Sequence, residues 1–265
     1  MIFLVILLLV ALILLIYLSS QNSDDSLSET IVLKYHEEMK AHSDVVPAKQ
    51  INLFVEYYLS GNSDRQKEID STFQNNLNEP GINHIYIIVH NLEEIERIHS
   101  LKTNGFTLIP IKVSRPTYGQ LFSIMRKYGG NDDINILANS DMAFNSTINL
   151  VRQLRTNEVL ALTRWNLYST EKPFQGKLES HIGWSQDVWI FRGYPHSDLC
   201  DISFTTGVLR CDNRLAYLLH QSGYSIFNPC YDIHTWHIHK SNFRTYSEND
   251  KLKGMGAFIP LCNWV

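Results

Sequence analysis

Asp141 is the first residue whose type and position could support chemistry. It closes the triplet Asn139-Ser140-Asp141, which directly follows the apolar run Ile134-Asn-Ile-Leu-Ala. A carboxylate at the end of a buried strand can bind a divalent cation, and such a cation can bridge a diphosphate leaving group. For an isolated triplet, an aspartate in a turn or a cap is the commoner interpretation. If the triplet instead has a chemical role, Asp141 is a candidate metal ligand and Asn139 a candidate contact for a bound ligand.

A second acid, Asp212, precedes a predicted helix at residues 214–222 that ends at Gly223. A carboxylate at such a position could accept a proton from a reacting group. An aspartate at a helix start is also a routine cap. Asp187, in Ser185-Gln186-Asp187, could bind acceptor hydroxyls or serve as the base in place of Asp212.

Three histidines lie close together in His234-Thr-Trp-His237-Ile-His239. If this segment is a strand, alternation places His237 and His239 on the same face. Imidazole binds most divalent transition metals, so these side chains are candidate metal ligands. Histidines of a surface or core that bind nothing are the other interpretation.

A nucleotide diphosphate also requires positive charge. Arg115 and Arg164 each follow an apolar run, where a phosphate could be met. Trp165, Trp184 and Trp189 could stack on sugar rings, although core packing is the expected role for at least one of these three.

The elements that must position these residues alternate between strands and helices. Short apolar runs rich in β-branched and aromatic residues predict strands, and spacing of three to four residues predicts helices. The predicted strands are residues 51–58, 84–89, 106–113, 134–137, 159–162, 188–191, 224–227 and 234–239, and the helices are 63–77, 118–128 and 214–222. This alternation predicts an α/β fold with a mostly parallel sheet, whose ligands bind beyond the carboxyl ends of the strands.

The order of the motifs resembles the nucleotide-sugar-dependent glycosyltransferases of the GT-A fold over about 190 residues. The triplet ending at Asp141 is similar to the family's strand-end acidic motif, usually Asp-x-Asp, and Asn139 replaces its first acid. Four further stretches are shared with uncharacterised GT-A-like proteins, namely Arg115-Pro-x-Tyr, Ala138-Asn-Ser-Asp, Leu162-x-Arg-Trp and Ser185-Gln-Asp-x-Trp.

The resemblance implies a single GT-A-like, Rossmann-like domain at residues 51–246 and a transfer of sugar from a nucleotide-sugar donor to a hydroxyl acceptor. It implies Mn²⁺ or Mg²⁺ held by Asp141 together with His237 or His239. Asp212 corresponds to the acid that deprotonates the acceptor in inverting members. Because Asn139 replaces an acid, a binding module that has lost catalysis is the first alternative; a metal hydrolase built on the histidine cluster is the second.

The two ends of the chain differ from this domain. The uncharged, apolar run Met1–Leu18 is about 27 Å long as a helix, which is sufficient to span a bilayer. We therefore expect a signal anchor at residues 1–20, with a cleaved signal peptide as the alternative. Residues 21–50 are predicted to be a stem and lead-in, and residues 247–265 a tail or flap.

A short N-terminus before one span favours an N-in, C-out orientation, with the domain in an ER/Golgi-type lumen or outside the cell. In such a compartment the four cysteines could form two disulfides, and four buried thiols are the alternative. The formal net charge of -4 and the absence of a long basic run give no support to nucleic-acid binding.

Overall fold

The computed structural model describes residues 30–34, 36, 38–39, 42–101, 105–113, 115–169, 172–238 and 251–265. The span predicted at residues 1–20 and the candidate ligand His239 lie outside these ranges. Among the described helices, none combines the length and the apolar character that crossing a membrane requires.

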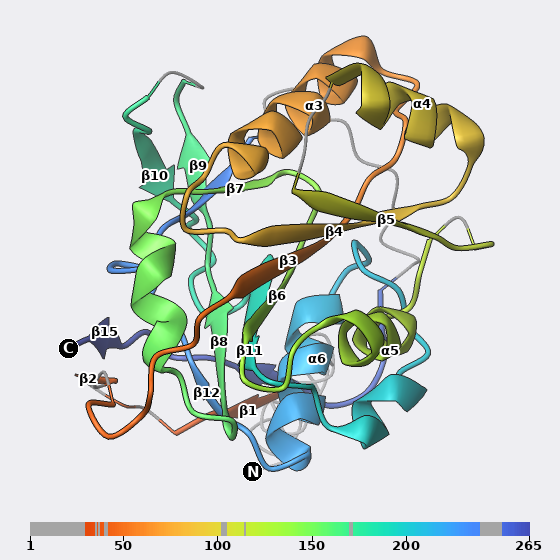
Figure 1. The fold of residues 1–265 in the computed structure, drawn as a ribbon. Coiled ribbons are helices and arrows are strands. Elements are labelled where there is room, and N and C mark those ends of the chain that lie inside the picture. The colour runs from red at the N-terminus through yellow and green to blue at the C-terminus, as the bar shows by residue number, and fades with distance from the viewer. Residues whose placement is uncertain are drawn as a thin grey trace, which may run out of the picture.

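A seven-stranded sheet forms the centre of the molecule (Figure 1), in the order β12-β8-β11-β6-β3-β4-β5. Only β11 runs antiparallel to its neighbours. The mostly parallel α/β sheet predicted from the sequence is thereby confirmed. Its strands are β3 (Ile51–Glu56), β4 (His84–Val89), β5 (Phe106–Pro110), β6 (Ile134–Ala138), β8 (Glu158–Leu162), β11 (Val188–Arg192) and β12 (Ser225–Phe227).

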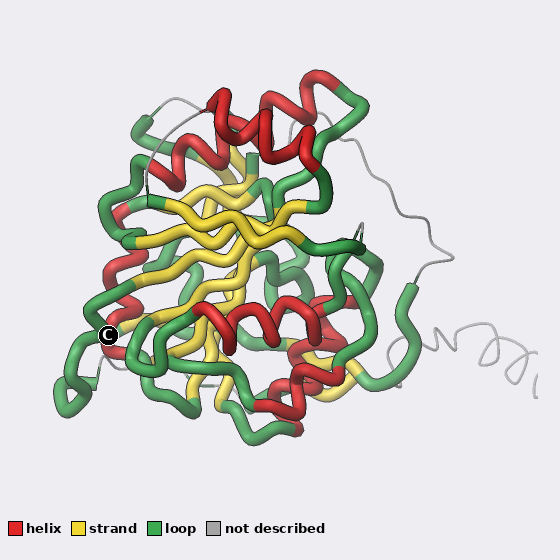
Figure 2. The backbone as a smooth tube through the Cα atoms, turned by 45° about the vertical axis from the view of Figure 1, so that its right-hand side comes forward, coloured by secondary structure: helices red, strands yellow, loops and turns green. Residues whose placement is uncertain are grey.

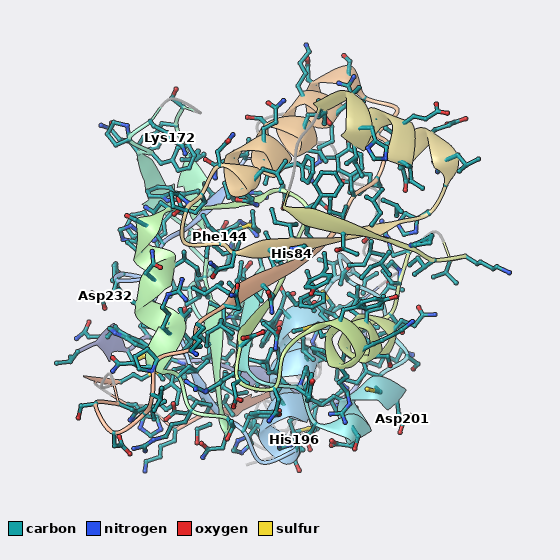
Figure 3. All side chains as sticks on the ribbon, viewed as in Figure 1. His84, Phe144, Lys172, His196, Asp201 and Asp232 are labelled. Carbon is teal, nitrogen blue, oxygen red and sulfur yellow. The ribbon has the colours of Figure 1, made fainter. Side chains whose placement is uncertain are left out.

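The central strands are buried on both faces, which explains why their sequences are continuous apolar runs. Every residue of β6 and β8 is buried. Two hydrophobic clusters cover the two faces, one under α3 (Ser63–Leu77) and the 3-10 helix η1 (Ser146–Gln153), the other under α5 (Tyr118–Tyr128) and α6 (Cys211–Gln221). Figure 2 shows helices on both sides of the sheet, and Figure 3 shows the side chains that fill the space between the layers.

The helices begin at identifiable caps. The side chain of Asn62 accepts hydrogen bonds from the first backbone N–H groups of α3. Thr117 and Gln120 form a reciprocal capping box at the start of α5. The sequence analysis did not predict the helix α4 (Leu92–Leu101), whose buried face consists of only a few residues.

A smaller sheet, with strand order β10-β9-β13-β7, is built beside the main one. Its strands are β7 (Met142–Phe144), β9 (Trp165–Leu167), β10 (Gly176–Leu178) and β13 (Thr235–His237). β13 pairs with both β7 and β9, so that it joins segments that directly follow two strands of the main sheet. This pairing brings the histidine segment to the end of β6.

The described parts of the two chain ends pair with each other. β1 (Thr30–Val32) is parallel to β14 (Gly256–Phe258), and β2 (Glu38–Met39) is parallel to β15 (Asn263–Trp264). A 3-10 helix, η2 (Ser197–Asp201), packs against α5. All four cysteines are free thiols, and three of them are buried. Of the two alternatives, disulfides or unpaired thiols, the structure has the unpaired thiols.

Candidate functional site

The chemistry-bearing residues gather at one edge of the main sheet. From β3 the chain proceeds to β4 and β5 on one side, and β6 then returns to the other side of β3. Such a reversal of strand order creates a crevice beyond the carboxyl ends of the strands, where ligands of open α/β sheets bind. Asp141 follows β6 and Arg164 follows β8, while Asp187 precedes the antiparallel β11 and so reaches the same edge.

Asp141 is buried between two cationic or potentially cationic side chains. Its Oδ2 accepts a hydrogen bond from Arg65 Nη2 at 2.7 Å and lies 3.1 Å from His237 Nε2. Burial alone would raise the pKa of Asp141, but the nearby His237 and Arg65 outweigh burial and hold that pKa far below its ordinary value. Asp141 is therefore ionised at every physiological pH.

The tautomer of His237 follows from its second contact. Its Nδ1 lies 3.1 Å from Asn166 Oδ1, which also accepts from Arg164 Nε, while Asn166 Nδ2 donates to Glu179. Because the amide orientation is fixed in this way, Nδ1 of His237 is the donor to Asn166. Nε2 then faces the Asp141 carboxylate. Two acceptors do not attract each other, so this contact requires either a proton on Nε2 or a cation bound by both groups.

Arg164 connects this histidine to the remaining acids. Its Nη1 donates to Asp187 Oδ2 at 2.7 Å and its Nη2 to Glu179 Oε2 at 3.0 Å. Burial by itself would raise the pKa of Glu179, but the hydrogen bond from Asn166 and the charge of Arg164 lower it to about 2. The guanidinium predicted to meet a phosphate is thus occupied in holding carboxylates.

Asn139 and Asp187 form a direct pair. Asn139 Nδ2 donates to Asp187 Oδ1 at 2.8 Å, and the backbone N–H of Asn139 donates to the carbonyl of Asp187. Both carboxylate oxygens of Asp187 are therefore engaged, one by Asn139 and one by Arg164. The amide that replaces the first acid of the motif anchors a neighbouring carboxylate.

Asp212 lies in the first turn of α6, close enough to Asp187 for the two carboxylates to repel each other. Burial and the charge of Asp187 raise the pKa of Asp212 to about 7. The residue before the helix, Arg210, has a φ of 67°, which is unusual for a side chain other than glycine. Its guanidinium donates to the carbonyls of Leu252 and Gly254, so that the C-terminal segment fixes this turn.

Gln186 also lies at this edge of the sheet, and the sequence had suggested no role for it. Its side chain is fully buried, and within the described part of the chain neither its Oε1 nor its Nε2 has a hydrogen-bond partner. Its backbone N–H contacts the carboxylate of Asp212. Buried side-chain amides without a hydrogen-bond partner are uncommon in folded proteins.

The other predicted residues lie in different surroundings. Trp189 is buried in the core, and Trp165 is half-buried, with Nε1 donating to the Cys230 carbonyl. Trp184 is 38% exposed and packs edge-on against Phe258. Arg115 is exposed on the loop between β5 and α5.

Sequence reasoning missed Arg65, Asn166 and Glu179. Arg65 belongs to the run Ser63-Asp-Arg-Gln-Lys-Glu, which has the composition of a solvated first helical turn. Nothing in that run indicates a contact with Asp141, 76 positions away. Asn166 lies beyond the strand predicted at residues 159–162, in β9, which was not predicted from the sequence.

The donor set allows a direct test of the expected metal. Asp141 Oδ2 and His237 Nε2 lie 3.1 Å apart, close to the roughly 3 Å between neighbouring ligands of a cation with bonds of about 2.1 Å. The pair therefore fits one edge of a coordination sphere. Among the described residues, no group of three or more His, Cys, Asp or Glu side chains is placed to hold a metal. A bound ligand or water would have to supply the other positions.

Comparisons with known proteins find remote likeness of structure. No family model matches the chain, and no curated protein matches its sequence. A mannosyltransferase from Pyrobaculum calidifontis, in complex with GDP-Man and Mn²⁺, is 14% identical at a TM-score of 0.48. That match covers 76% of this chain and 61% of the other, so the chain spans less than two thirds of it.

Two further structures have comparable likeness. A 4-diphosphocytidyl-2C-methyl-D-erythritol synthase from Anaerococcus prevotii is 12% identical, with a TM-score of 0.43 and coverage of 76% of this chain and 92% of the other. A structure assigned as a glucose-1-phosphate thymidylyltransferase from Bacillus anthracis, in complex with sucrose, is 11% identical. Its TM-score is 0.40, with coverage of 68% and 86%. At these identities and TM-scores the likeness to all three structures is remote.

Proposed function

We propose that this chain is an enzyme that transfers a sugar from a nucleotide-sugar donor to a hydroxyl acceptor. The observation that carries the proposal is one connected set of side chains at the edge of the sheet. It runs from Asp141 through His237, Asn166 and Arg164 to Asp187. Asp212 lies beside the last of these carboxylates.

Asp212 is the base of the proposed reaction. Its raised pKa brings a carboxylate close to the pH at which proton acceptance from an alcohol is most effective. Asp187 has both oxygens engaged, so that it positions the acceptor and the base instead of accepting the proton. The acceptor oxygen bonds to the anomeric carbon, its proton passes to Asp212, and the bond to the nucleoside diphosphate breaks. Such a direct displacement inverts the anomeric centre.

The leaving diphosphate requires positive charge beside Asp141. Mn²⁺ or Mg²⁺, held by Asp141 and His237, would stabilise the charge that develops on the leaving group. Asn166 orients His237 for this role through Nδ1, as groups behind a metal ligand commonly do.

The location of the enzyme is part of the same proposal. The run Met1–Leu18 is apolar and uncharged, which supports a single membrane anchor, and for this anchor we propose the N-in, C-out orientation. The domain would then face an ER/Golgi-type lumen or the outside of the cell, where a glycan, protein or lipid hydroxyl is the acceptor.

Release of nucleoside diphosphate from a panel of UDP- and GDP-sugars, with Mn²⁺ or Mg²⁺ present, tests the proposal. The full-length protein should release nucleotide, and Asp212→Asn should reduce the rate by about 100-fold or more. Asp132→Asn, an exposed aspartate before β6, is the matched control and should retain full activity. Undiminished activity of Asp212→Asn would contradict the assignment of the base.

A binding module that has lost catalysis is the second candidate, and Asn139 in place of an acid is the observation that favours it. It predicts that nucleotide sugars bind without turnover under the same conditions. The histidine-based hydrolase has less support, because His234 donates to the carbonyl of Tyr231 and packs edge-on against Trp165.

A further inference from the structure

Arg65 is the side chain of this site that neither the motifs nor the proposed reaction explains. It lies in the first turn of α3 and is 6% exposed. Its Nη2 donates to Asp141 Oδ2 and to Tyr58 Oη, its Nε also donates to Tyr58, and its Nη1 donates to Glu68 at 3.2 Å. A buried guanidinium is thus fixed on the same oxygen that would bind a metal.

We propose that Arg65 is a resident cation of the diphosphate site, which replaces part of the charge of a divalent metal and keeps the affinity for that metal low. The inference deepens the proposed function and rests on it. It concerns how this chain meets a diphosphate group, not which sugar or nucleotide it uses.

Two independent features point in this direction. The first is the loss of an acid, since Asn139 gives its amide to Asp187 and adds no negative charge beside Asp141. The second is the gain of the guanidinium on Asp141 itself. A site with two acids and no arginine needs a divalent cation to overcome the repulsion of a diphosphate, whereas here Arg65 already places one positive charge against Asp141, with Glu68 on its other side.

The position of Arg65 agrees with this role. Arg65 follows β3 and Asp141 follows β6, the two neighbouring strands between which the strand order reverses. Asn62 already caps the N-terminus of this helix, so the guanidinium of Arg65, and not the helix end, is the group that would face a diphosphate at this reversal of strand order.

The same geometry limits metal binding. A divalent cation on Asp141 Oδ2 must approach a guanidinium whose Nη2 is 2.7 Å from that oxygen, and the two positive charges repel each other. Arg65 has few alternative positions because Tyr58 and Glu68 also hold it. Removal of the guanidinium should therefore weaken diphosphate binding and strengthen metal binding, which are opposite effects of a single substitution.

Two binding measurements on the full-length protein test the proposal without any assay of activity. Inorganic pyrophosphate is titrated by calorimetry in EDTA, and free Mn²⁺ is followed by electron paramagnetic resonance. We expect the wild type to bind pyrophosphate in EDTA. Arg65→Gln should lose about tenfold or more of that affinity, and should bind Mn²⁺ about tenfold more tightly, each equivalent to roughly 1.4 kcal/mol.

Two further variants keep the result interpretable. Arg65→Lys retains the positive charge beside Asp141 and should keep the Mn²⁺ affinity close to that of the wild type, although one ammonium group cannot make all the contacts of the guanidinium. Arg155→Gln removes the arginine of an exposed ion pair with Asp44 and should change neither affinity. Circular dichroism and the melting temperature show whether Arg65→Gln remains folded.

Unchanged Mn²⁺ affinity in Arg65→Gln would overturn the proposal, and so would pyrophosphate binding that does not depend on Arg65 or that fails in EDTA. These outcomes are distinguishable from failure of the proposed function. If no nucleotide sugar is turned over but both affinities shift as expected, the inference stands and the reaction is wrong.

Discussion

His237 Nε2 lies 3.1 Å from Asp141 Oδ2, although the two residues are 96 positions apart in the chain. The contact is produced by β13, which pairs antiparallel with β7 so that His237 is opposite Met142, the residue after Asp141. The backbone N–H of Ile238 also donates to the carbonyl of Asp141. The small sheet therefore fixes the histidine on the strand-end acid before any ligand arrives.

Replacing this acid should affect both folding and catalysis. Asp141→Asn removes one of the two carboxylates that hold the buried guanidinium of Arg65, and breaking one partner of a buried ion pair costs about 3 kcal/mol or more. We expect that loss in urea unfolding, with transfer reduced by at least about 100-fold. Asp64→Asn, which breaks the exposed pair with Lys67, should cost less than about 1 kcal/mol. Equal losses in the two variants would contradict the importance assigned to burial.

Because of Asp212, activity should rise with pH while the stability of the folded protein falls. A base must be ionised, so we expect the transfer rate to rise with pH through the raised pKa of Asp212. The folded protein retains this proton to a higher pH than the unfolded chain does. Its stability contribution is therefore largest below the unfolded pKa and is lost as the pH rises through the folded pKa.

Asp212→Asn cannot ionise and should remove that loss. At pH 8 the variant should be more stable than the wild type by on the order of 1 kcal/mol, and the difference should shrink at pH 5. Urea unfolding at both pH values provides the measurement. A variant that is less stable than the wild type at pH 8 would show that the carboxylate is favourably held.

Arg164 should not tolerate a conservative replacement. Lysine cannot reach Asp187, Glu179 and Asn166 together, because these contacts use three nitrogens of one planar guanidinium. We expect Arg164→Lys to lower the free energy of unfolding by about 2 kcal/mol and to reduce transfer by at least about tenfold. Arg155→Lys, on an exposed ion pair, is the matched control. Wild-type activity in Arg164→Lys would mean that Asp187 needs no fixed partner.

Arg210 permits a test of the turn that presents Asp212. Its φ of 67° is unfavourable for any residue with a Cβ, and both Arg210→Gly and Arg210→Ala remove the hydrogen bonds to the C-terminal segment. Glycine also relieves the backbone strain, so Arg210→Gly should be about 1 kcal/mol more stable than Arg210→Ala. Thermal unfolding of the two variants makes the comparison, and a more stable alanine variant would rule out the strained turn.

The sequence predicted the main sheet well because most of its strands are short apolar runs covered on both faces. The segments at residues 84–89 and 118–128 have the predicted bounds in the structure. The helix α4 was missed because its long charged face hides the few buried positions. The helix predicted at residues 63–77 also has these bounds in the structure, and the side chain of Asn62 makes its capping bonds.

The site was predictable only where a residue type and its strand-end position agreed. Asp141, His237, Asp187 and Asp212 lie at the same edge, as the motifs suggested, although their roles stay predictions. Arg164 was expected to meet a phosphate and instead binds carboxylates. Arg65 has a helical, charged neighbourhood in sequence, and only the fold reveals that its guanidinium faces inward.

The pairing of β1 with β14 and of β2 with β15 has a practical consequence for protein production. A shortened version that starts after residue 39 would lack β1 and β2, and the strands at residues 256–258 and 263–264 would each present an open backbone edge. Unpaired edges attract strands from other molecules and promote self-association. A truncated protein intended for crystallisation should therefore begin at or before Thr30.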